Sequence, residues 1–152
     1  MIHPPQRSPR VKVGGLYHFG RMLDKVRAHQ RGELPEEYHP NFGLRMGLDG
    51  LLCAFLGVTF AELCARVAEG GTDEEILAWC CERGPCPLSE GRTFGWNEFA
   101  RKVGWSDIAG RFLKKVKAED GISDRDDLVT AFDIIDFREG RAKKQAHPSA
   151  GG

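Results

Sequence analysis

The fold class is decided by residues 59–80, TFAELCARVAEGGTDEEILAWC, which contain two helix starts in succession. Thr59 with Glu62, and Thr72 with Glu75, each match a capping box. In a capping box the hydroxyl accepts from a backbone N–H that the helix leaves unbonded, and the glutamate bonds back to the cap residue. Two adjacent glycines lie between the boxes, where they are typical of a helix end. The stretch therefore predicts two short helices joined by a tight turn.

Helical spacing continues outward in both directions. Leu16, Phe19, Leu23 and Val26 advance by three or four residues, which places them on one face of a first helix that ends near Gly32. Residues 33–48 are rich in proline and glycine and predict a loop. Further helices are predicted after the capping residues Asp49, Ser89, Ser106 and Ser123, the last of these paired with Asp126. In the helix after Ser106, the residues predicted to face inward are Ile108, Phe112, Leu113 and Val116.

No stretch of convincing length alternates apolar and polar residues as a strand would. We therefore predict an all-α protein, a single compact domain of about seven short helices. The predicted organisation is an extended N-terminal arm over residues 1–13, a helical domain over residues 14–140 and a flexible, disordered tail over residues 141–152.

The composition is that of a soluble globular protein, with 41% hydrophobic and 29% charged residues in a chain of 152. No window of 18 apolar residues is present, which excludes a membrane span, and the basic, proline-rich start is not a secretory signal. The expected location is therefore cytoplasmic. The five cysteines lack the paired spacing of a zinc site, so core packing is expected of them, with no metal and no cofactor.

The zero net charge hides a strong asymmetry. Residues 1–31 hold seven Arg or Lys and one Asp, whereas residues 32–152 hold fifteen Arg or Lys and twenty-one Asp or Glu. The segment 119–139 alone carries eight acids and two arginines. It is an obvious internal counterpart for the basic N-terminal part.

The basic charge of the first helix is concentrated along one edge. At 100° per residue, His18, Arg21, Lys25 and His29 fall within about one quarter of the circumference. The following loop, which contains His39 and Asn41, returns toward that edge. Read as a site, these side chains could bind a phosphate or a carboxylate, because Arg offers a planar fork and Lys a mobile point charge.

Other interpretations of the same residues stay open. His29 and His39 with Glu36 or Asp49 could hold a metal, although the spacing is not that of a known metal motif. A histidine beside a carboxylate could act as a general base, although no nucleophile motif accompanies it. Finally, the basic edge could be a solvated face, or could pair with the acidic remainder of the molecule.

Nucleic acid is an unlikely partner. The basic residues near the N-terminus could contact phosphates, but the whole chain has no excess positive charge and lacks a helix-turn-helix, zinc-finger or RNA-binding motif.

Several segments together resemble a known family. They are SPR at 8–10, GGLYHFGRMLDKVRAHQRGELPEEYHPN at 14–41, LDG at 48–50, FLGV at 55–58, EGGTDEEILAWC at 69–80, WNEFARKVGW at 96–105 and FDIIDFREGR at 132–141. Their combination is similar to the bacterial domain of unknown function 5069 family, and residues 18–20 and 43–47 depart from its pattern. The resemblance implies a small, soluble, helical bacterial protein. It brings no established activity or catalytic residue, and the candidates it leaves are Arg21, Asp24, Lys25 and His39.

The function favoured by the sequence is a binding or interaction module rather than an enzyme. Its expected partner is an anionic small molecule or an acidic protein surface, with no membrane involved. The predicted ligand-binding residues are Arg21, Lys25, His29, His39 and Asn41. One alternative is a small enzyme that uses His29 or His39 with a carboxylate, either with or without a metal, and another is a nucleic-acid-associated protein.

Overall fold

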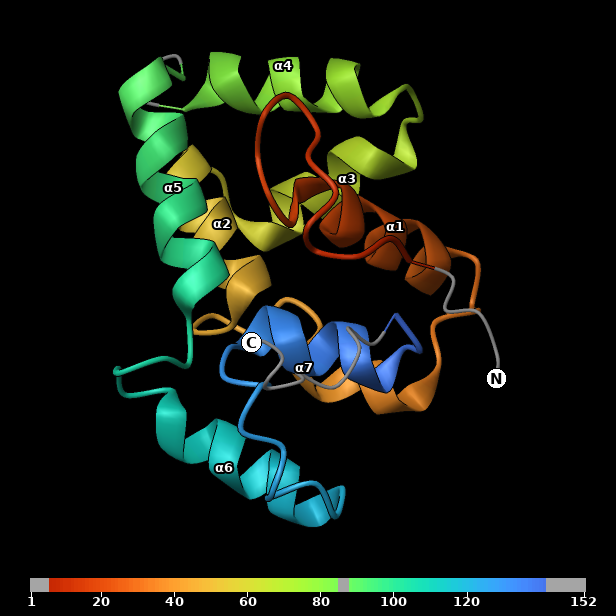
Figure 1. The fold of residues 1–152 in the computed structure, drawn as a ribbon. Helices are drawn as coiled ribbons and strands as arrows, with labels where there is room; N and C mark the ends of the chain where they lie inside the picture. The colour runs from red at the N-terminus through yellow and green to blue at the C-terminus, as the bar shows by residue number, and fades with distance from the viewer. Residues whose placement is uncertain (1–5, 85–87, 142–152) are drawn as a thin grey trace. The chain divides into compact units, whose positions relative to one another are not determined.

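The structure of the protein, a computed structural model, describes residues 6–84 and 88–141. Over these residues the regular elements are seven α-helices and one 3-10 helix (Figure 1). The only β pairing in the described ranges is an isolated antiparallel bridge between Val13 and Leu16. The predicted all-α class is therefore confirmed.

The described residues form two compact units. The N-terminal unit reaches to Ala100, and the C-terminal unit begins at Arg101, inside the helix α5. The helices of the N-terminal unit are α1 (Phe19–Gln30), the 3-10 helix η1 (Glu36–Asn41), α2 (Leu48–Leu56), α3 (Phe60–Ala68), α4 (Asp73–Arg83) and most of α5 (Glu90–Lys102). Those of the C-terminal unit are α6 (Gly110–Glu119) and α7 (Ala131–Arg138).

Helix α3 is central to the N-terminal unit, since it contacts α1, α2 and α4. Most of the large side chains that this unit buries completely are apolar. Burying one side chain of this size stabilises the fold by about 1.5–3 kcal/mol. The largest of them are Leu16, Phe19, Met22, Leu23, Leu52, Leu63 and Ile76.

Both predicted capping boxes are confirmed. The hydroxyl of Thr59 accepts from the backbone N–H of Glu62 at 3.0 Å, and the carboxylate of Glu62 accepts from the N–H of Thr59 at 2.9 Å. Thr72 and Glu75 form the same pair of bonds at 3.1 and 2.8 Å. Helices α3 and α4 therefore begin where the sequence places them.

The first helix begins later than its apolar spacing indicated. Helix α1 starts at Phe19, because His18 adopts a left-handed backbone conformation with φ 73°, which an α-helix cannot contain. Leu16 is fully buried, but it lies in the turn that precedes the helix and bonds to Val13. A buried turn residue can match a helical spacing by chance. The sequence therefore could not show whether Leu16 belongs to the helix or to the turn before it.

The second helix does not use Asp49 as its cap. Helix α2 begins at Leu48 after Gly47, and Asp49 lies in its first turn with its side chain buried. The predicted loop before it contains the 3-10 helix η1, which accommodates Pro40 within its last turn.

The C-terminal unit is built on α6 and α7, which pack against each other (Figure 1). Its core consists of Leu113, Val116, Leu128 and Ile134. The prediction that Ser123 and Asp126 begin the last helix is wrong. The capping box is instead formed by Thr130 with Asp133, and residues 122–128 form turns.

The start of α6 also differs from the prediction. Ser106 lies in a loop with φ 54°, and α6 begins at Gly110 after Ala109. Because the helix starts three residues later than predicted, Ile108 lies outside it and is 94% exposed, and Phe112 is exposed as well. Leu113 and Val116 face the core as predicted.

The two ends of the chain were predicted to be an extended arm and a flexible tail. Residues 1–5 of the arm and residues 142–152 of the tail lie outside the described residues. In the remainder of the arm, Gln6, Ser8, Pro9 and Val13 are buried, whereas residues 10–12 are exposed. The predicted boundaries at residues 13 and 140 stay predictions.

Within the described part of the chain, no single helix is long and apolar enough to cross a membrane. Helices α2 and α3 reach the required length and composition only when taken together, and they are bent by 86° at their junction.

Candidate functional site

A buried charge cluster joins α1 to α2 in the N-terminal unit. His18, at the start of α1, and Lys25, two turns along it, both reach the carboxylate of Asp49 in the first turn of α2. His18 Nε2 lies 2.8 Å from Asp49 Oδ1, and Lys25 Nζ lies 2.8 Å from Oδ2. The backbone N–H of Gly43 also donates to Oδ2 at 2.9 Å. His18, Lys25 and Asp49 are 1%, 5% and 1% exposed. Asp49 is therefore the anion that His18 and Lys25, on the basic edge of α1, contact.

The cluster keeps Asp49 ionised although it is buried. Burial alone would raise the pKa of Asp49, but Lys25, His18 and the N–H of Gly43 outweigh it and hold that pKa well below its usual value. For His18 the balance is opposite. Burial lowers its pKa from 6.5 to about 4, and Lys25 and Arg21 act in the same direction, against the effect of Asp49. At neutral pH the cluster therefore holds a neutral imidazole, an ammonium and a carboxylate.

The hydrogen bonds fix the state of the His18 ring. An ionised carboxylate can only accept, so His18 carries its proton on Nε2 and donates it to Asp49. Its other ring nitrogen, Nδ1, is buried and has no hydrogen-bond partner among the described residues. A buried unsatisfied polar atom costs about 1–3 kcal/mol, and the left-handed backbone of His18 adds to that cost.

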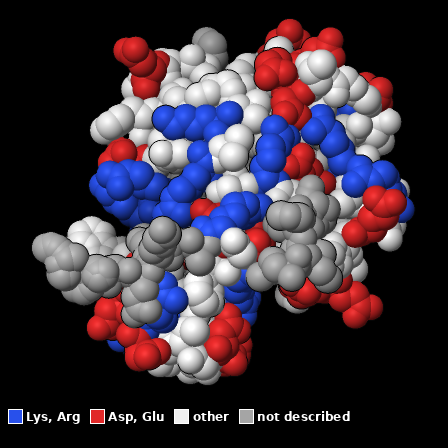
Figure 2. Space-filling view, turned by 45° about the vertical axis from the view of Figure 1, so that its right-hand side comes forward, with Lys and Arg blue, Asp and Glu red and all other residues white. Residues whose placement is uncertain are grey.

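A second group of ion pairs ties the arm to α1 and α4. Arg7 donates to both oxygens of Asp24 at 2.9 Å and lies 2.9 Å from Asp73, which also binds Arg27 at 2.7 Å. Asp24, through its hydrogen bond, raises the pKa of Arg7 above its usual value against the effect of burial. On the face shown in Figure 2, Lys and Arg side chains are interspersed with Asp and Glu in this way. Arg7, Lys25 and Arg27 of the N-terminal part therefore meet carboxylates of the same unit.

The structure separates the five predicted ligand-binding residues into two groups. Arg21 and Lys25 are buried, and Arg21 donates to the backbone oxygen of Arg7 at 3.2 Å. His29, His39 and Asn41 are exposed where the end of α1 meets η1. A ligand arriving from solvent thus reaches the second group but not the first.

The two exposed histidines form an aromatic cluster with Phe42. The ring of His29 stacks on Phe42 at 4.4 Å, and the centroids of the His29 and His39 rings are 6.1 Å apart. Nε2 of His39 lies 2.9 Å from the backbone oxygen of Leu34, to which it donates. Neither histidine is in an ion pair with a carboxylate among the described residues, which differs from the arrangement of the enzyme alternative.

Three kinds of group among the described residues bear on the enzyme alternative: metal ligands, a cysteine thiol and a histidine beside a carboxylate. No group of three or more His, Cys, Asp or Glu side chains within the described ranges could hold a metal ion. A recess of about 310 Å³ beside α2 is lined in part by Gly43, Gly50, Cys53 and Phe60. Burial raises the pKa of Cys53 to about 12, so its thiol stays protonated and is a poor nucleophile. Among the histidines that the structure describes, the one that contacts a carboxylate is His18, and it is buried.

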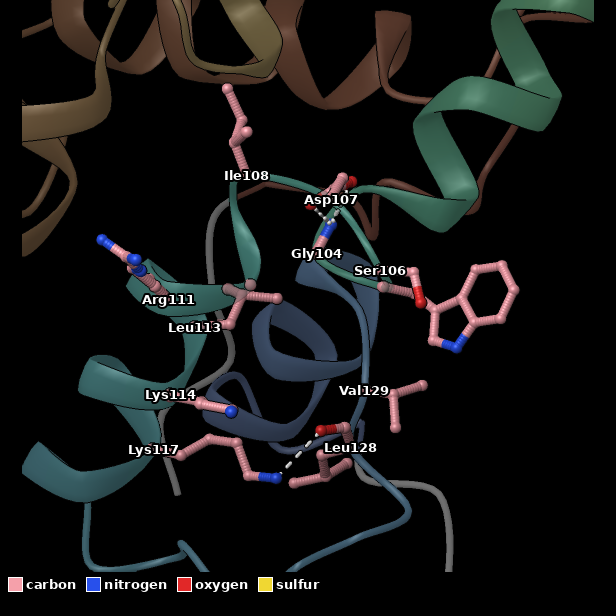
Figure 3. Close-up of a pocket in the computed structure, with 12 residues that line it drawn as sticks. Gly104, Ser106, Asp107, Ile108, Arg111, Leu113, Lys114, Lys117, Leu128 and Val129 are labelled. Atoms are coloured by element: carbon pink, nitrogen blue, oxygen red, sulfur yellow. Dashed lines mark hydrogen bonds between the residues drawn. The ribbon is translucent and has the colours of Figure 1, made fainter.

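The C-terminal unit contains a larger groove, which the sequence did not predict. It has a volume of about 580 Å³ and lies between the loop after α5, helix α6 and the segment of Leu128 and Val129 (Figure 3). Trp105 and Val129 line it and are exposed, and Ile108 projects from its rim. Residues 104–108 line the groove because α6 starts only at Gly110, which leaves them in a loop. The apolar spacing of the sequence did not predict this late start.

Cationic side chains from α6 surround this groove. Arg111, Lys114 and Lys117 line it, and Lys115 lies on the next position of the same helix. Lys117 donates to the backbone oxygens of Arg125 and Leu128 at 2.6 and 3.1 Å. Arg111, Lys114 and Lys115 are exposed and form no ion pair or hydrogen bond with the residues that the structure describes.

Several carboxylates of the C-terminal unit are in ion pairs with arginines of the same unit. Asp120 binds Arg138, Asp127 binds Arg125, and Asp136 and Glu139 bind Arg141, at 2.7–3.0 Å. The lone carboxylate that lines the groove, Asp107, accepts from the backbone N–H groups of Gly104 and Ala109. The acidic segment 119–139 thus contains carboxylates that pair within its own unit.

Comparison with known families gives a match for this chain. Residues 3–141 match the family described as Domain of unknown function (DUF5069). No curated protein matches the chain. The match includes both units, and the family description names no activity and no ligand.

Proposed function

The chain belongs to the DUF5069 family, and from its own geometry we propose that it is a binding module for an acidic protein partner. The proposal places the contact on α6 of the C-terminal unit. The observation that supports it is the set of three exposed cations, Arg111, Lys114 and Lys115, that have no partner among the described residues.

These cations are costly to the isolated unit. Arg111 precedes Lys114 by three positions and Lys115 by four, so they are neighbours on the helix surface, where like charges repel by a few tenths of a kcal/mol per pair. Carboxylates from a partner would replace that repulsion with charge-assisted hydrogen bonds. Exposed apolar side chains lie beside them, and a mixture of aromatic, aliphatic and Arg residues is typical of protein interfaces.

The charge of the unit favours protein over nucleic acid. Residues 101–141 contain nine Arg or Lys and nine Asp or Glu. A polyphosphate would approach a unit with no excess positive charge, and its repulsion from the acidic residues would offset its attraction to α6. A folded acidic segment can instead place its few carboxylates at the three cations and keep the rest of its surface free of negative charge.

Binding to poly-L-glutamate tests the proposal. Replacing Arg111, Lys114 and Lys115 together by Gln should weaken binding in titration calorimetry by about tenfold or more at low salt, since each lost charge-assisted bond contributes more than a neutral one. The matched control replaces Arg31, Arg83 and Arg138 by Gln, three exposed arginines that are in ion pairs. Equal losses in the two variants would show that net charge alone governs binding and would contradict the proposal.

A second candidate is the anion site predicted in the N-terminal unit, reduced to the side chains that are exposed. His29, His39 and Asn41 are exposed near the end of α1, where imidazole and amide N–H groups can donate to an anion. Titration with inorganic phosphate should move the amide and ring resonances of these residues in NMR spectra. Unchanged resonances would exclude phosphate as the ligand of this surface.

A further inference from the structure

Resting on the proposed function, we infer that the groove beside α6 takes the apolar side chain of an acidic amphipathic helix, whose carboxylates meet Arg111 and Lys114. The proposed function needs only charge. The inference adds a defined site, an apolar anchor and the secondary structure of the partner.

The walls of the groove are held in place before anything binds. The carboxylate of Asp107 accepts from Gly104 N–H at 3.0 Å and from Ala109 N–H at 2.9 Å, which fixes the loop before α6. On the other side, Lys117 bonds α6 to the carbonyls of Arg125 and Leu128 (Figure 3). A preformed groove loses little conformational entropy on binding, so its apolar area contributes to affinity.

The interior of the groove is apolar. Leu113 and Leu128 belong to the core of the unit and also line the groove, while Val129 and Trp105 remain partly open to water at 46% and 58% exposure. At about 580 Å³ the groove lies within the range of ligand pockets, so it can admit one Leu or Phe side chain. Its occupant is therefore expected to present an apolar anchor.

The positions of the charges define what flanks that anchor. Lys114 extends from α6 toward the segment of Val129, whereas Arg111 lines the groove from the start of α6 and its guanidinium points away from Val129 (Figure 3). The two cations are three positions apart on one helix. A carboxylate placed three or four positions from an apolar anchor on a partner helix lies on the same face as that anchor, so carboxylates before and after it can meet the two cations while the anchor enters the groove. Charge complementarity thus selects an acidic helix over a neutral or basic one.

The groove favours a helix over an added strand. Its walls are a loop and a helix, and no strand edge is present in the described residues to which an extended peptide could add. Laying the apolar face of a helix into a groove is the recognition mode that fits such walls.

Designed peptides test the inference. The probe is a short alanine-rich helix with one Leu anchor flanked by Glu three positions before and four positions after it. Binding is measured by fluorescence anisotropy, with the emission of Trp105 as a second readout. Replacing the Leu anchor by Ala should weaken binding by about tenfold, which corresponds to about 1.4 kcal/mol. Replacing both Glu by Gln should weaken it further and remove its salt dependence.

Variants of the protein locate the contact. Val129→Ser should weaken binding of the Leu peptide several-fold and leave the Ala peptide unaffected. Phe94→Ser is the matched control, since Phe94 is an exposed apolar residue of α5 that does not line the groove. If Val129→Ser lowers the circular dichroism signal, Arg111→Gln with Lys114→Gln provides the test at exposed positions instead.

The two proposals fail separately. If the Leu and Ala peptides bind equally while poly-L-glutamate binding still depends on α6, the groove inference is wrong and the proposed function stands. If poly-L-glutamate binding is independent of α6, the proposed function is wrong. Self-association in sedimentation that the Leu peptide does not displace would show a second copy in the groove and would overturn the inference.

Discussion

Two basic helices of this protein differ in what meets their charge. In the N-terminal unit, Lys25 of α1 is buried against Asp49. In the C-terminal unit, Arg111, Lys114 and Lys115 of α6 are exposed and have no partner among the described residues. The first set of charges is part of how the unit folds, and the second is free to act on another molecule. A count of basic residues in the sequence cannot distinguish the two, because it does not show where the carboxylates lie.

The largest expected effect tests the structural role of the α1 cluster. Asp49→Asn should lower the free energy of unfolding by about 3–5 kcal/mol, because Lys25 would then be a buried charge without a carboxylate. Urea denaturation followed by circular dichroism measures the change. The matched control is Asp120→Asn, which removes an exposed pair with Arg138 and should cost less than about 1 kcal/mol. Similar losses of free energy of unfolding in both variants would show that Asp49 contributes no more to stability than an exposed charge.

The pH dependence of stability tests the same cluster through His18. Its pKa in the folded protein is about 4 and its usual value is 6.5, so the unfolded chain binds more protons between these pH values. The contribution of His18 to the free energy of unfolding should therefore be fully present above pH 6.5. It should decrease by on the order of 3 kcal/mol as the pH is lowered to 4. Asp49, whose pKa is also lowered, adds a further loss at still lower pH. Urea denaturation across this range should show the slope in the native protein and a reduced slope in His18→Gln. An unchanged slope in that variant would assign the effect to other groups.

The shape of the groove is tested at Gly104. This residue has φ 103°, and a Cβ atom there would collide with the side chain of Leu113. Gly104→Ala should therefore destabilise the C-terminal unit by about 2–3 kcal/mol in thermal unfolding and distort the groove. Gly121→Ala is the control, since Gly121 also has positive φ but a Cβ there would meet nothing within 4 Å, and about 1 kcal/mol is expected. Equal costs would show that Leu113 adapts and that the groove is less rigid than its hydrogen bonds indicate.

The smallest expected effect concerns the cations of α6. Replacing Arg111, Lys114 and Lys115 by Gln should change the free energy of unfolding by less than about 0.5 kcal/mol, because the change removes repulsion and breaks no bond to a described residue. Thermal unfolding at low and high salt measures it. A loss of stability comparable to that of Asp49→Asn would mean that these charges are structural too, and the contrast between the two helices would disappear.

Much of the fold could be predicted from local sequence. The capping boxes at Thr59 and Thr72 form as expected, because both partners of a capping box lie within four residues of each other. Predictions that involved longer distances were less successful. Thr130, rather than Ser123, caps α7, since the backbone between them is held in turns that involve Arg125 and Ile122.

The candidate site could be predicted only in part. The sequence indicated that the first helix has a basic edge, and the structure brings His18 and Lys25 together there. Their partner, Asp49, was predicted to be a helix cap, because local sequence cannot show that a side chain 24 positions away from Lys25 lies in contact with it. The groove was missed because it depends on where α6 begins.

The sequence by itself determined the helical class, two of the helix starts and the uneven distribution of charge, since each follows from residues close together in the chain. The tertiary structure alone decided which charges are neutralised and which face solvent. The physical reason is that burial and ion pairing depend on distances between segments far apart in sequence. Those distances are set by the packing of the core.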